Sequence, residues 1–379
     1  MAQLGKILLL AEANSMNSSS LGTLDLARAL ASRGLDVVTI ASAGPTMVEK
    51  FRKAGLPLRC YYRIQRKTLP YILNHKIIRL AEAAEPDIIH ACSPRLSSLA
   101  ARLARACRVK YVVTAGNAAE CRCNMKCTRR FGGLIATSQF LREWIVNSGI
   151  IPKEAITVIH SGVEVELFER MPEPAMPLRW PQRDFRREKA PAPSPQACAP
   201  VVGMIGKFAS GAGHDCFLNA AKRIAGEMPE VQFIIAGDGP GRYVRDRLEK
   251  AGLVKRTTIL PAFLDFRHML ASIDVLLVPG VAEGQSRLIL DAMASRRPVI
   301  ATGVGDNYEV IKDGENGLLV PRNDCEAFAA KTLRVLKDSD FCRQITSSAF
   351  ESVRNHFSLA RMANDTIAFY DHALTEELV

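Results

Sequence analysis

Apolar runs alternate with amphipathic segments along nearly the whole chain. Unbroken apolar runs predict buried parallel strands, and apolar positions that recur every three or four residues predict helices. In the first half of the chain, the predicted strands are 6–11, 36–41, 87–90, 111–114, 134–137 and 156–159, and the predicted helices are 21–32, 96–107 and 139–147. In the second half, the predicted strands are 201–205, 231–236, 257–260, 274–278, 298–302 and 317–320, with a helix at 214–228. Such alternation is typical of α/β domains with parallel sheets.

One segment fits neither period and predicts a domain boundary. Residues 171–200 contain eight prolines and are also rich in arginine, which is typical of a linker. The sequence therefore predicts two Rossmann-like, doubly wound α/β domains, 1–170 and 201–357, followed by a last helix within 358–379.

The strongest candidate chemistry lies in a strand, turn and helix near the C-terminal end of the second domain. The strand 275–278 is followed by a polar turn that contains Glu283 and Gly284, and the helix after it carries Asp291. A helix start offers unpaired backbone N–H groups and a positive dipole end, which suit a phosphate. Gly284 and Asp291 lie about two turns apart and share one helix face. The two acids therefore predict contacts to hydroxyl groups beside a phosphate, although both could equally be solvated.

This segment resembles a known family. Glu283 and Asp291 are similar to the acidic pair, two glutamates separated by seven residues, of the retaining glycosyltransferases of family 4. Further segments agree with that family in order and spacing: Ser161-Gly162-Val163-Glu164, Gly206-Lys207-Phe208, Gly237-Asp238-Gly239-Pro240 and residues 313–320. The resemblance implies the GT-B fold, in which an acceptor-side domain (1–170) and a donor-binding domain (201–357) face each other across a cleft. It also implies that the helix within 358–379 crosses back to the first domain.

The resemblance implies a function. A sugar would pass from a nucleotide-sugar, with UDP- or GDP-sugars expected, to an acceptor with retention of anomeric configuration, in envelope glycan, lipopolysaccharide or glycolipid synthesis. No metal or other cofactor is expected. Glu283 and Asn117 would act at the sugar. The implied donor-binding residues are Asn17, Ser18, Gly206, Lys207, Gly237, Asp238, Gly239, Gly284, Gln285, Ser286 and Asp291.

The chain departs from the family at several of these places. Ala212 stands where a lysine is usual, Gly116 where a histidine is usual, and Asn17 and Ser18 where a glycine pair is usual. Two hypotheses follow: a divergent active transferase, or a protein that keeps the fold and binds a nucleotide, a partner or a membrane without efficient transfer. A dinucleotide dehydrogenase is excluded, because no GxGxxG follows a strand with an acid about twenty residues on.

Charge is divided unequally between the two halves of this 379-residue chain. Residues 1–190 hold 29 Lys and Arg against 16 Asp and Glu, and residues 191–379 hold 21 against 23. An anionic membrane surface or a lipid-linked or glycan acceptor would fit this excess, whereas no nucleic-acid recognition motif is present. The expected contacts lie in a basic stretch, at Arg52, Lys53, Arg63, Arg66 and Lys67. Its apolar residues fit a lipid surface or, equally, an ordinary helix whose apolar face is core.

Cysteine usage indicates a reducing compartment. The ten cysteines are scattered, and the first residues lack the layout of a signal peptide, so a cytoplasmic protein is expected, with a peripheral position on the inner membrane face. Cys121, Cys123 and Cys127 form the one cluster. Free thiols are favoured over a metal site there, because a fourth ligand at usual spacing is missing.

Overall fold

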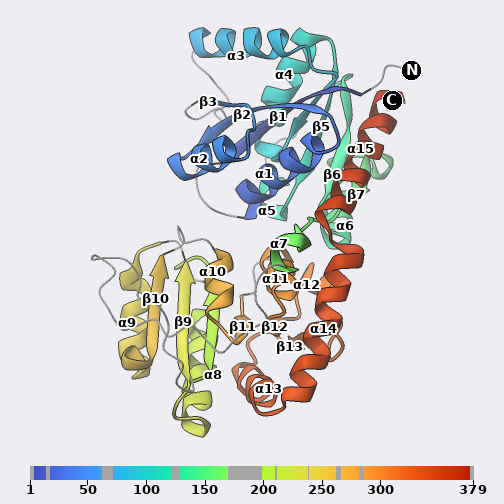
Figure 1. Ribbon diagram of the computed structural model, residues 1–379. Coiled ribbons are helices and arrows are strands. Elements are labelled where there is room, and N and C mark those ends of the chain that lie inside the picture. The colour runs from blue at the N-terminus through green and yellow to red at the C-terminus, as the bar shows by residue number, and fades with distance from the viewer. Residues whose placement is uncertain are drawn as a thin grey trace. The chain divides into compact units, whose positions relative to one another are not determined.

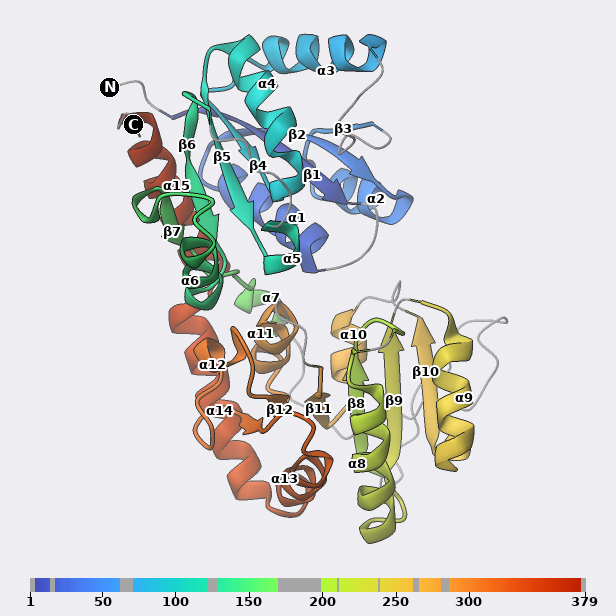
Figure 2. The ribbon, with the colours of Figure 1, turned by 180° about the vertical axis from the view of Figure 1, so that it is seen from behind.

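The computed structural model describes residues 4–13, 18–61, 71–121, 128–169, 199–209, 211–237, 239–261, 266–280 and 286–375. The chain divides into two compact units (Figures 1 and 2). The first unit comprises Met1–Glu164 and Phe357–Val379, and the second comprises Val165–His356.

The first unit is built on a parallel sheet of seven strands in the order β3-β2-β1-β4-β5-β6-β7. The strands are β1 (Lys6–Ala13), β2 (Asp36–Ala43), β3 (Leu58–Cys60), β4 (Ile88–Ala91), β5 (Lys110–Ala115), β6 (Phe131–Ala136) and β7 (Ile156–Val158). All of them except β3 overlap the predicted runs. The apolar pattern does not predict β3, because β3 is a short edge strand with two exposed residues.

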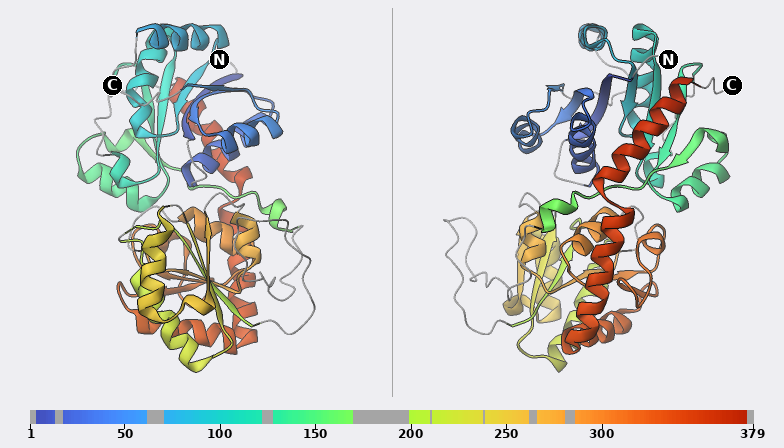
Figure 3. Two further views of the ribbon diagram at one scale, coloured as in Figure 1. Left: turned by 90° about the vertical axis from the view of Figure 1, so that its left-hand side faces the viewer. Right: turned by 45° about the vertical axis from the view of Figure 1, so that its right-hand side comes forward.

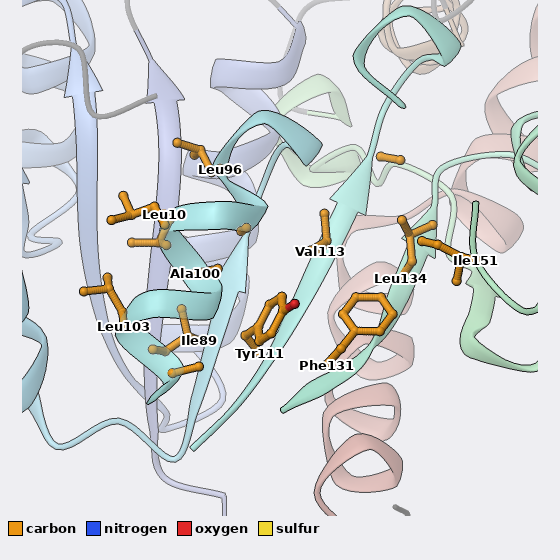
Figure 4. Close-up of a cluster of buried hydrophobic side chains, with 14 of the residues drawn as sticks. Leu10, Ile89, Leu96, Ala100, Leu103, Tyr111, Val113, Phe131, Leu134 and Ile151 are labelled. Atoms are coloured by element: carbon orange, nitrogen blue, oxygen red, sulfur yellow. The ribbon is translucent and has the colours of Figure 1, made fainter. Parts of the chain in front are cut away.

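Helices cover both faces of this sheet. They are α1 (Ser18–Ala31), α2 (Pro45–Lys53), α3 (Tyr71–Ala84), α4 (Ser97–Cys107), α5 (Ala118–Cys121), α6 (Gln139–Asn147) and α15 (Leu359–Thr375). Side chains alternate along β1, so that Leu8 and Leu10 pack with α3 and α4, whereas Ile7 and Leu9 pack with α1, α2 and α15. Figure 4 shows side chains of α4 resting on Leu10 and its neighbours.

Glycines let the C-terminal helix return to this unit. Gly133 on β6 has a φ of +125°, and a Cβ there would lie 2.9 Å from the Phe369 ring on α15. A Cβ on Gly162 would lie 2.8 Å from the Cα of Leu359. Because real Cβ contacts are longer than this, only glycine lets α15 pack so closely. The predicted return of the last helix is therefore confirmed.

The second unit is built on a parallel sheet of six strands in the order β10-β9-β8-β11-β12-β13. The strands are β8 (Val201–Ile205), β9 (Gln232–Gly237), β10 (Thr257–Pro261), β11 (Val275–Val278), β12 (Val299–Thr302) and β13 (Leu318–Val320). The helices are α7 (Val165–Glu169), α8 (His214–Glu227), α9 (Gly241–Ala251), α10 (Phe266–Ala271), α11 (Ser286–Ala294), α12 (Asn307–Val310), α13 (Cys325–Lys337) and α14 (Ser339–His356). One face of the sheet shares its core with α8, α9 and α13 (Figure 3). Two doubly wound parallel sheets are therefore present, as the sequence predicts.

Candidate active site

The most developed site lies at the carboxyl edge of the second sheet. The strand order changes direction between β8 and β11, which are neighbours in the sheet although far apart in sequence. Open α/β sheets bind ligands outside the carboxyl ends of their strands at such a switch point. Gly206 directly follows β8, and Pro279 and Gly280 directly follow β11. The predicted donor-binding residues Gly206 and Lys207 therefore lie where this fold places ligands.

Close backbone packing explains the glycines of this edge. A Cβ on Gly237 would lie 1.8 Å from the carbonyl oxygen of Gly206 and 2.6 Å from the Phe208 ring. Gly239 has a φ of +132°, and its Cβ would lie 3.0 Å from Phe208. No other residue fits either position without moving backbone, so the ends of β8 and β9 meet through glycine. Asp238, between them, lies outside the described residues.

The start of α8 backs directly onto the segment after β11. Gly213 precedes the helix with a φ of +87°, and a Cβ there would lie 2.5 Å from the carbonyl carbon of Pro279. Gly213 makes no side-chain cap, so the N–H groups of the first turn of α8 have no capping partner within the described chain. Lys207 is exposed in the same loop. A helix start with a nearby lysine is an arrangement that binds anions.

His214, the first residue of α8, was not among the residues predicted from sequence. Its side chain is buried, with 2% exposure, and its ring packs edge-on against Phe208 and Tyr243 with centroid separations of 6.0 and 5.6 Å. Neither ring nitrogen makes a hydrogen bond of good geometry with the described residues. Burial lowers its pKa, as does the nearby Arg247, whereas Asp215 and the Ala209 carbonyl act in the opposite direction. The sequence signal for His214 is its position at a predicted helix start, directly after a glycine-rich loop.

The acidic pair is only partly described. Asp291 lies on α11 with 1% exposure, and its Oδ2 accepts a hydrogen bond of 2.7 Å from Nε of Arg287. Their side chains are 2% and 11% exposed, so this is a buried ion pair. Asp291 therefore lies inside the unit with an arginine partner. Glu283, Gly284 and Gln285 lie outside the described residues, and Ser286 is described only as the first residue of α11.

The residues predicted in the first unit are spread along its carboxyl edge. Oδ1 of Asn117 accepts a hydrogen bond of 2.9 Å from the backbone N–H of Glu120, which makes Asn117 the cap of the short helix α5. Ser18 begins α1, and Asn17 lies outside the described residues. The side-chain oxygen of Asn117 therefore stabilises the first turn of α5.

A small charged cluster lies beside Asn117. Glu12 is on β1, and its Oε2 lies 3.9 Å from Nη1 of Arg95. Burial raises the pKa of Glu12, Arg95 opposes that shift and the nearby Glu120 adds to it. Ser93 donates a hydrogen bond of 3.3 Å to Glu120. Glu12 lies near the end of β1, and the other side chains follow β4 and β5, so polar groups gather at the switch point of the first sheet.

The basic stretch proves to have a core-facing apolar side. Met47, Phe51 and Ile77 are buried in the first unit and are not available to a lipid surface. Arg52 and Lys53 are exposed and pair with Glu49 at 2.7 and 3.6 Å. Residues Arg63, Arg66 and Lys67 lie outside the described residues. No helix in the described part of the chain is long and apolar enough to span a bilayer.

The thiol cluster is also only partly described. Cys121 is buried on α5, and its thiol donates a hydrogen bond of 3.4 Å to the carbonyl oxygen of Asn117. Cys123 and Cys127 lie outside the described residues. Within the described ranges, no three His, Cys, Asp or Glu side chains come close enough to hold a metal ion.

Comparison with known proteins identifies both units. Residues 21–167 match the family described as Glycosyltransferase Family 4, and residues 199–338 match Glycosyl transferases group 1. An uncharacterised glycosyltransferase of Methanocaldococcus jannaschii is 24% identical over 341 residues, which cover 83% of this chain and 84% of that protein. The lipopolysaccharide core biosynthesis glycosyltransferase LpsE of Rhizobium meliloti is 24% identical over 340 residues, covering 88% of this chain and 89% of that one.

Solved structures agree on the fold. The crystal structure of HepE from Anabaena, in complex with UDP and glucose, superposes with a TM-score of 0.78 and 19% identity. The superposition covers 97% of this chain and 99% of HepE. Each unit therefore matches a glycosyltransferase family model, and the two-domain fold is that of GT-B glycosyltransferase structures.

Proposed function

We propose that the protein transfers a sugar from a nucleoside-diphosphate sugar to a hydroxyl of an envelope glycan, lipopolysaccharide or glycolipid, with retention of anomeric configuration. One observation carries the proposal. Gly206, Lys207, Gly237 and the start of α8 lie at the carboxyl edge of the second sheet, where Gly213 packs against Pro279 and Gly280 after β11. The UDP and glucose in the HepE structure support a UDP-sugar donor, and the name of LpsE supports a lipopolysaccharide acceptor.

The residues of this edge fit the chemistry of the leaving group. In the reaction, the bond from the anomeric carbon to the diphosphate oxygen breaks, and the diphosphate keeps the electron pair. The acceptor oxygen bonds to the anomeric carbon and releases its proton. Lys207 and the first-turn N–H groups of α8 would stabilise the negative charge that develops on the diphosphate.

The acidic pair would act on the sugar side of the same reaction. Glu283 is proposed to hold sugar hydroxyls and Asp291 the ribose, with Gly284, Gln285 and Ser286 offering contacts to sugar or phosphate. Asp291 is already bound to Arg287. Its role toward the ribose therefore requires the ligand to share the carboxylate with that arginine. These roles stay predictions.

Transfer and its stereochemistry provide the test. The purified protein is incubated with a panel of UDP-, GDP- and ADP-sugars and with lipopolysaccharide core or glycolipid acceptors, and NMR of the anomeric proton reads the product configuration. Glu283→Ala should lose transfer, whereas Glu315→Ala, which removes an exposed carboxylate of the same unit, should keep it. A product of inverted configuration would contradict retention. Nucleotide binding without any transfer would favour the alternative of a binding protein.

The exposed cations of the first unit suggest where the acceptor is presented. We propose that Arg52 and Lys53 approach an anionic membrane surface on the cytoplasmic side, because their side chains are both 72% exposed. Flotation with vesicles of anionic and neutral lipid tests this, with Arg52→Glu/Lys53→Glu as the variant. Equal flotation with both lipids would remove the membrane from the proposal.

A further inference from the structure

The first turns of α8 and α13 bring two cysteine thiols together. Cys216 is the third residue of α8, and Cys325 is the first residue of α13. The thiol of Cys325 donates a hydrogen bond of 3.6 Å to the carbonyl oxygen of Asn323. Sγ of Cys325 is then left to accept the hydrogen bond that joins it to the Cys216 thiol. The two sulfur atoms are therefore neighbours, although residues 217–324 separate them in the sequence.

The two helices that carry these thiols run side by side in one direction. Both pack on the same face of the second sheet. The thiols join the starts of the helices, and at their C-terminal ends Nζ of Lys337 lies 3.2 Å from Oε2 of Glu227. Axes of packed helices lie about 8–10 Å apart and each Cα lies about 2.3 Å from its axis, so facing Cα atoms come within the roughly 4–7 Å that a disulfide spans.

The start of α13 is fixed by its own cap. Oδ1 of Asp324 accepts a hydrogen bond of 2.9 Å from the backbone N–H of Ala327. Asn323, one residue earlier, adopts a φ of +63° and turns the chain into the helix. The backbone that carries Cys325 is therefore held in place beside α8.

The two thiols differ in their surroundings. Cys216 packs against the apolar core that α8 shares with α13. Burial raises the pKa of its thiol, and the neighbouring Cys325 and Asp324 add to that shift. Cys325 is half-buried and lies between the exposed residues Asn323 and Glu326. Because the thiolate is the reactive form and access is also required, Cys325 is the thiol that meets an oxidant first, and Cys216 is the one that closes the bond.

We propose that Cys216 and Cys325 form an oxidation site at which hydrogen peroxide closes a reversible disulfide between α8 and α13. Sγ of Cys325 attacks one oxygen of the peroxide, the O–O bond breaks, and a sulfenic acid and water form. Sγ of Cys216 then attacks the Cys325 sulfur, the S–O bond breaks, and the Cys216 proton leaves with the hydroxyl as a second water. The two thiols lose two electrons, and the peroxide gains them.

The disulfide would act on the start of α8. While it lasts, it ties the first turn of that helix to α13. In a reducing compartment, which the cysteine usage predicts, such bonds are transient and are reduced again by thiol exchange with glutathione. This oxidation site goes beyond the proposed function, because the proposed transfer uses neither thiol.

Peptide mapping of the whole protein tests the pairing. Trypsin places the two cysteines in peptides 208–222 and 323–331, each with a single cysteine. The reduced protein is treated with hydrogen peroxide near neutral pH, the remaining thiols are alkylated, and the digest is analysed by mass spectrometry. A product that joins the two peptides should exceed any linked peptide of Cys342, which packs on the same core, by about tenfold or more, because a disulfide needs adjacent sulfur atoms. Dithiothreitol should remove it.

Matched variants and thermal unfolding complete the test. Cys342→Ser should keep the linked product, and Cys325→Ser should abolish it. Oxidation should raise the Tm of the wild type by roughly 5–10 °C, because the bond closes a long loop in the unfolded chain, and should not raise that of Cys325→Ser. Oxidation of either thiol to sulfinic acid without the linked product would overturn the inference. A linked product that forms only in urea, or a Tm that falls on oxidation, would also overturn it, since the folded helices would then not bring the two sulfur atoms together.

Discussion

The two units each contain a buried histidine, and the two histidines differ in the hydrogen bonds that their ring nitrogens make. In the first unit, Nδ1 of His90 lies 2.6 Å from the Tyr370 hydroxyl, and Nε2 lies 2.7 Å from the Thr114 hydroxyl. In the second unit, neither nitrogen of His214 makes a hydrogen bond of good geometry within the described chain, and only the Ala209 backbone acts on the ring as an acceptor. Both rings are almost completely buried, with 1% and 2% exposure. Burial alone therefore does not reveal what a histidine does, whereas the state of its nitrogens does.

The difference follows from what surrounds each ring. His90 lies on a central strand, and its hydrogen bond with Tyr370 links the returning helix α15 to the sheet. His214 lies at the carboxyl edge, among glycines that hold backbone close together. The first histidine links two elements of the fold by hydrogen bonds, and the second packs edge-on between the rings of Phe208 and Tyr243. Substitutions at the two sites should therefore differ in kind.

The largest expected effect is on stability, at His90. His90→Leu leaves the buried Tyr370 hydroxyl and the Thr114 hydroxyl without this partner, and should lower the free energy of unfolding by about 3–4 kcal/mol. His214→Leu removes a buried imidazole that makes no hydrogen bond of good geometry with a described residue, so it should leave the free energy of unfolding unchanged or raise it by up to about 1–3 kcal/mol. Urea denaturation followed by circular dichroism measures both. Similar decreases in the free energy of unfolding of His90→Leu and His214→Leu would contradict the expected difference between the two sites.

The next effect is on activity, at the edge of the second sheet. Lys207→Ala should reduce kcat/KM for sugar transfer by about a hundredfold, equivalent to about 2.7 kcal/mol of transition-state stabilisation. The free energy of unfolding of Lys207→Ala should be unchanged, because the Lys207 side chain is exposed. Lys250→Ala, at an exposed lysine of α9 in the same unit, is the control and should keep full activity. A stability loss without a kinetic effect would assign Lys207 to the fold instead.

Most of the fold could be predicted from the sequence because its strands are buried on both faces. Runs such as that of β8 are apolar without a break, so they are visible without any partner. β3 is an edge strand with two exposed residues, and the sequence hides it. The return of α15 rested on a family resemblance. Its physical reason, Gly133 and Gly162 facing the helix, becomes visible only when sequentially distant segments are in contact.

The site was less predictable than the fold. Gly206 and Gly237 were expected to approach a nucleotide, and the structure shows that they also approach each other. Asp291 was expected to reach ribose hydroxyls, yet it is bound to Arg287, one helical turn away. His214 was missed, because neither the packing of its ring nor its lack of partners can be read from one position. The hydrogen-bond partners of a polar group depend on the three-dimensional structure, so the hydrophobic periodicity of the sequence does not predict them.

A pH titration of stability would sharpen the comparison further. Burial lowers the pKa of His90 to about 3, from about 6.5 when unfolded. The unfolded chain therefore binds more protons between these values, so stability is fully present above pH 6.5 and is lost as the pH falls. From pH 7 to pH 5, His90 should remove roughly 2 kcal/mol. In urea denaturation, the free energy of unfolding of His90→Gln should depend less on pH than that of the wild type. An unchanged pH dependence would mean that the pKa of His90 in the folded protein is close to its value in the unfolded chain.

The smallest effect tests single hydroxyls on the two ring partners. Tyr370→Phe keeps the ring on α15 but leaves Nδ1 of His90 without its partner, so it should cost about 1–2 kcal/mol. Tyr243→Phe keeps the edge-on contact with His214 and the stacking of Arg247 over its ring at 3.8 Å. It should change stability by less than about 0.5 kcal/mol. Urea denaturation of the two variants side by side measures the difference. Equal costs would show that the Tyr243 hydroxyl also supports a buried network, and the region around His214 would then be as firmly built as that around His90.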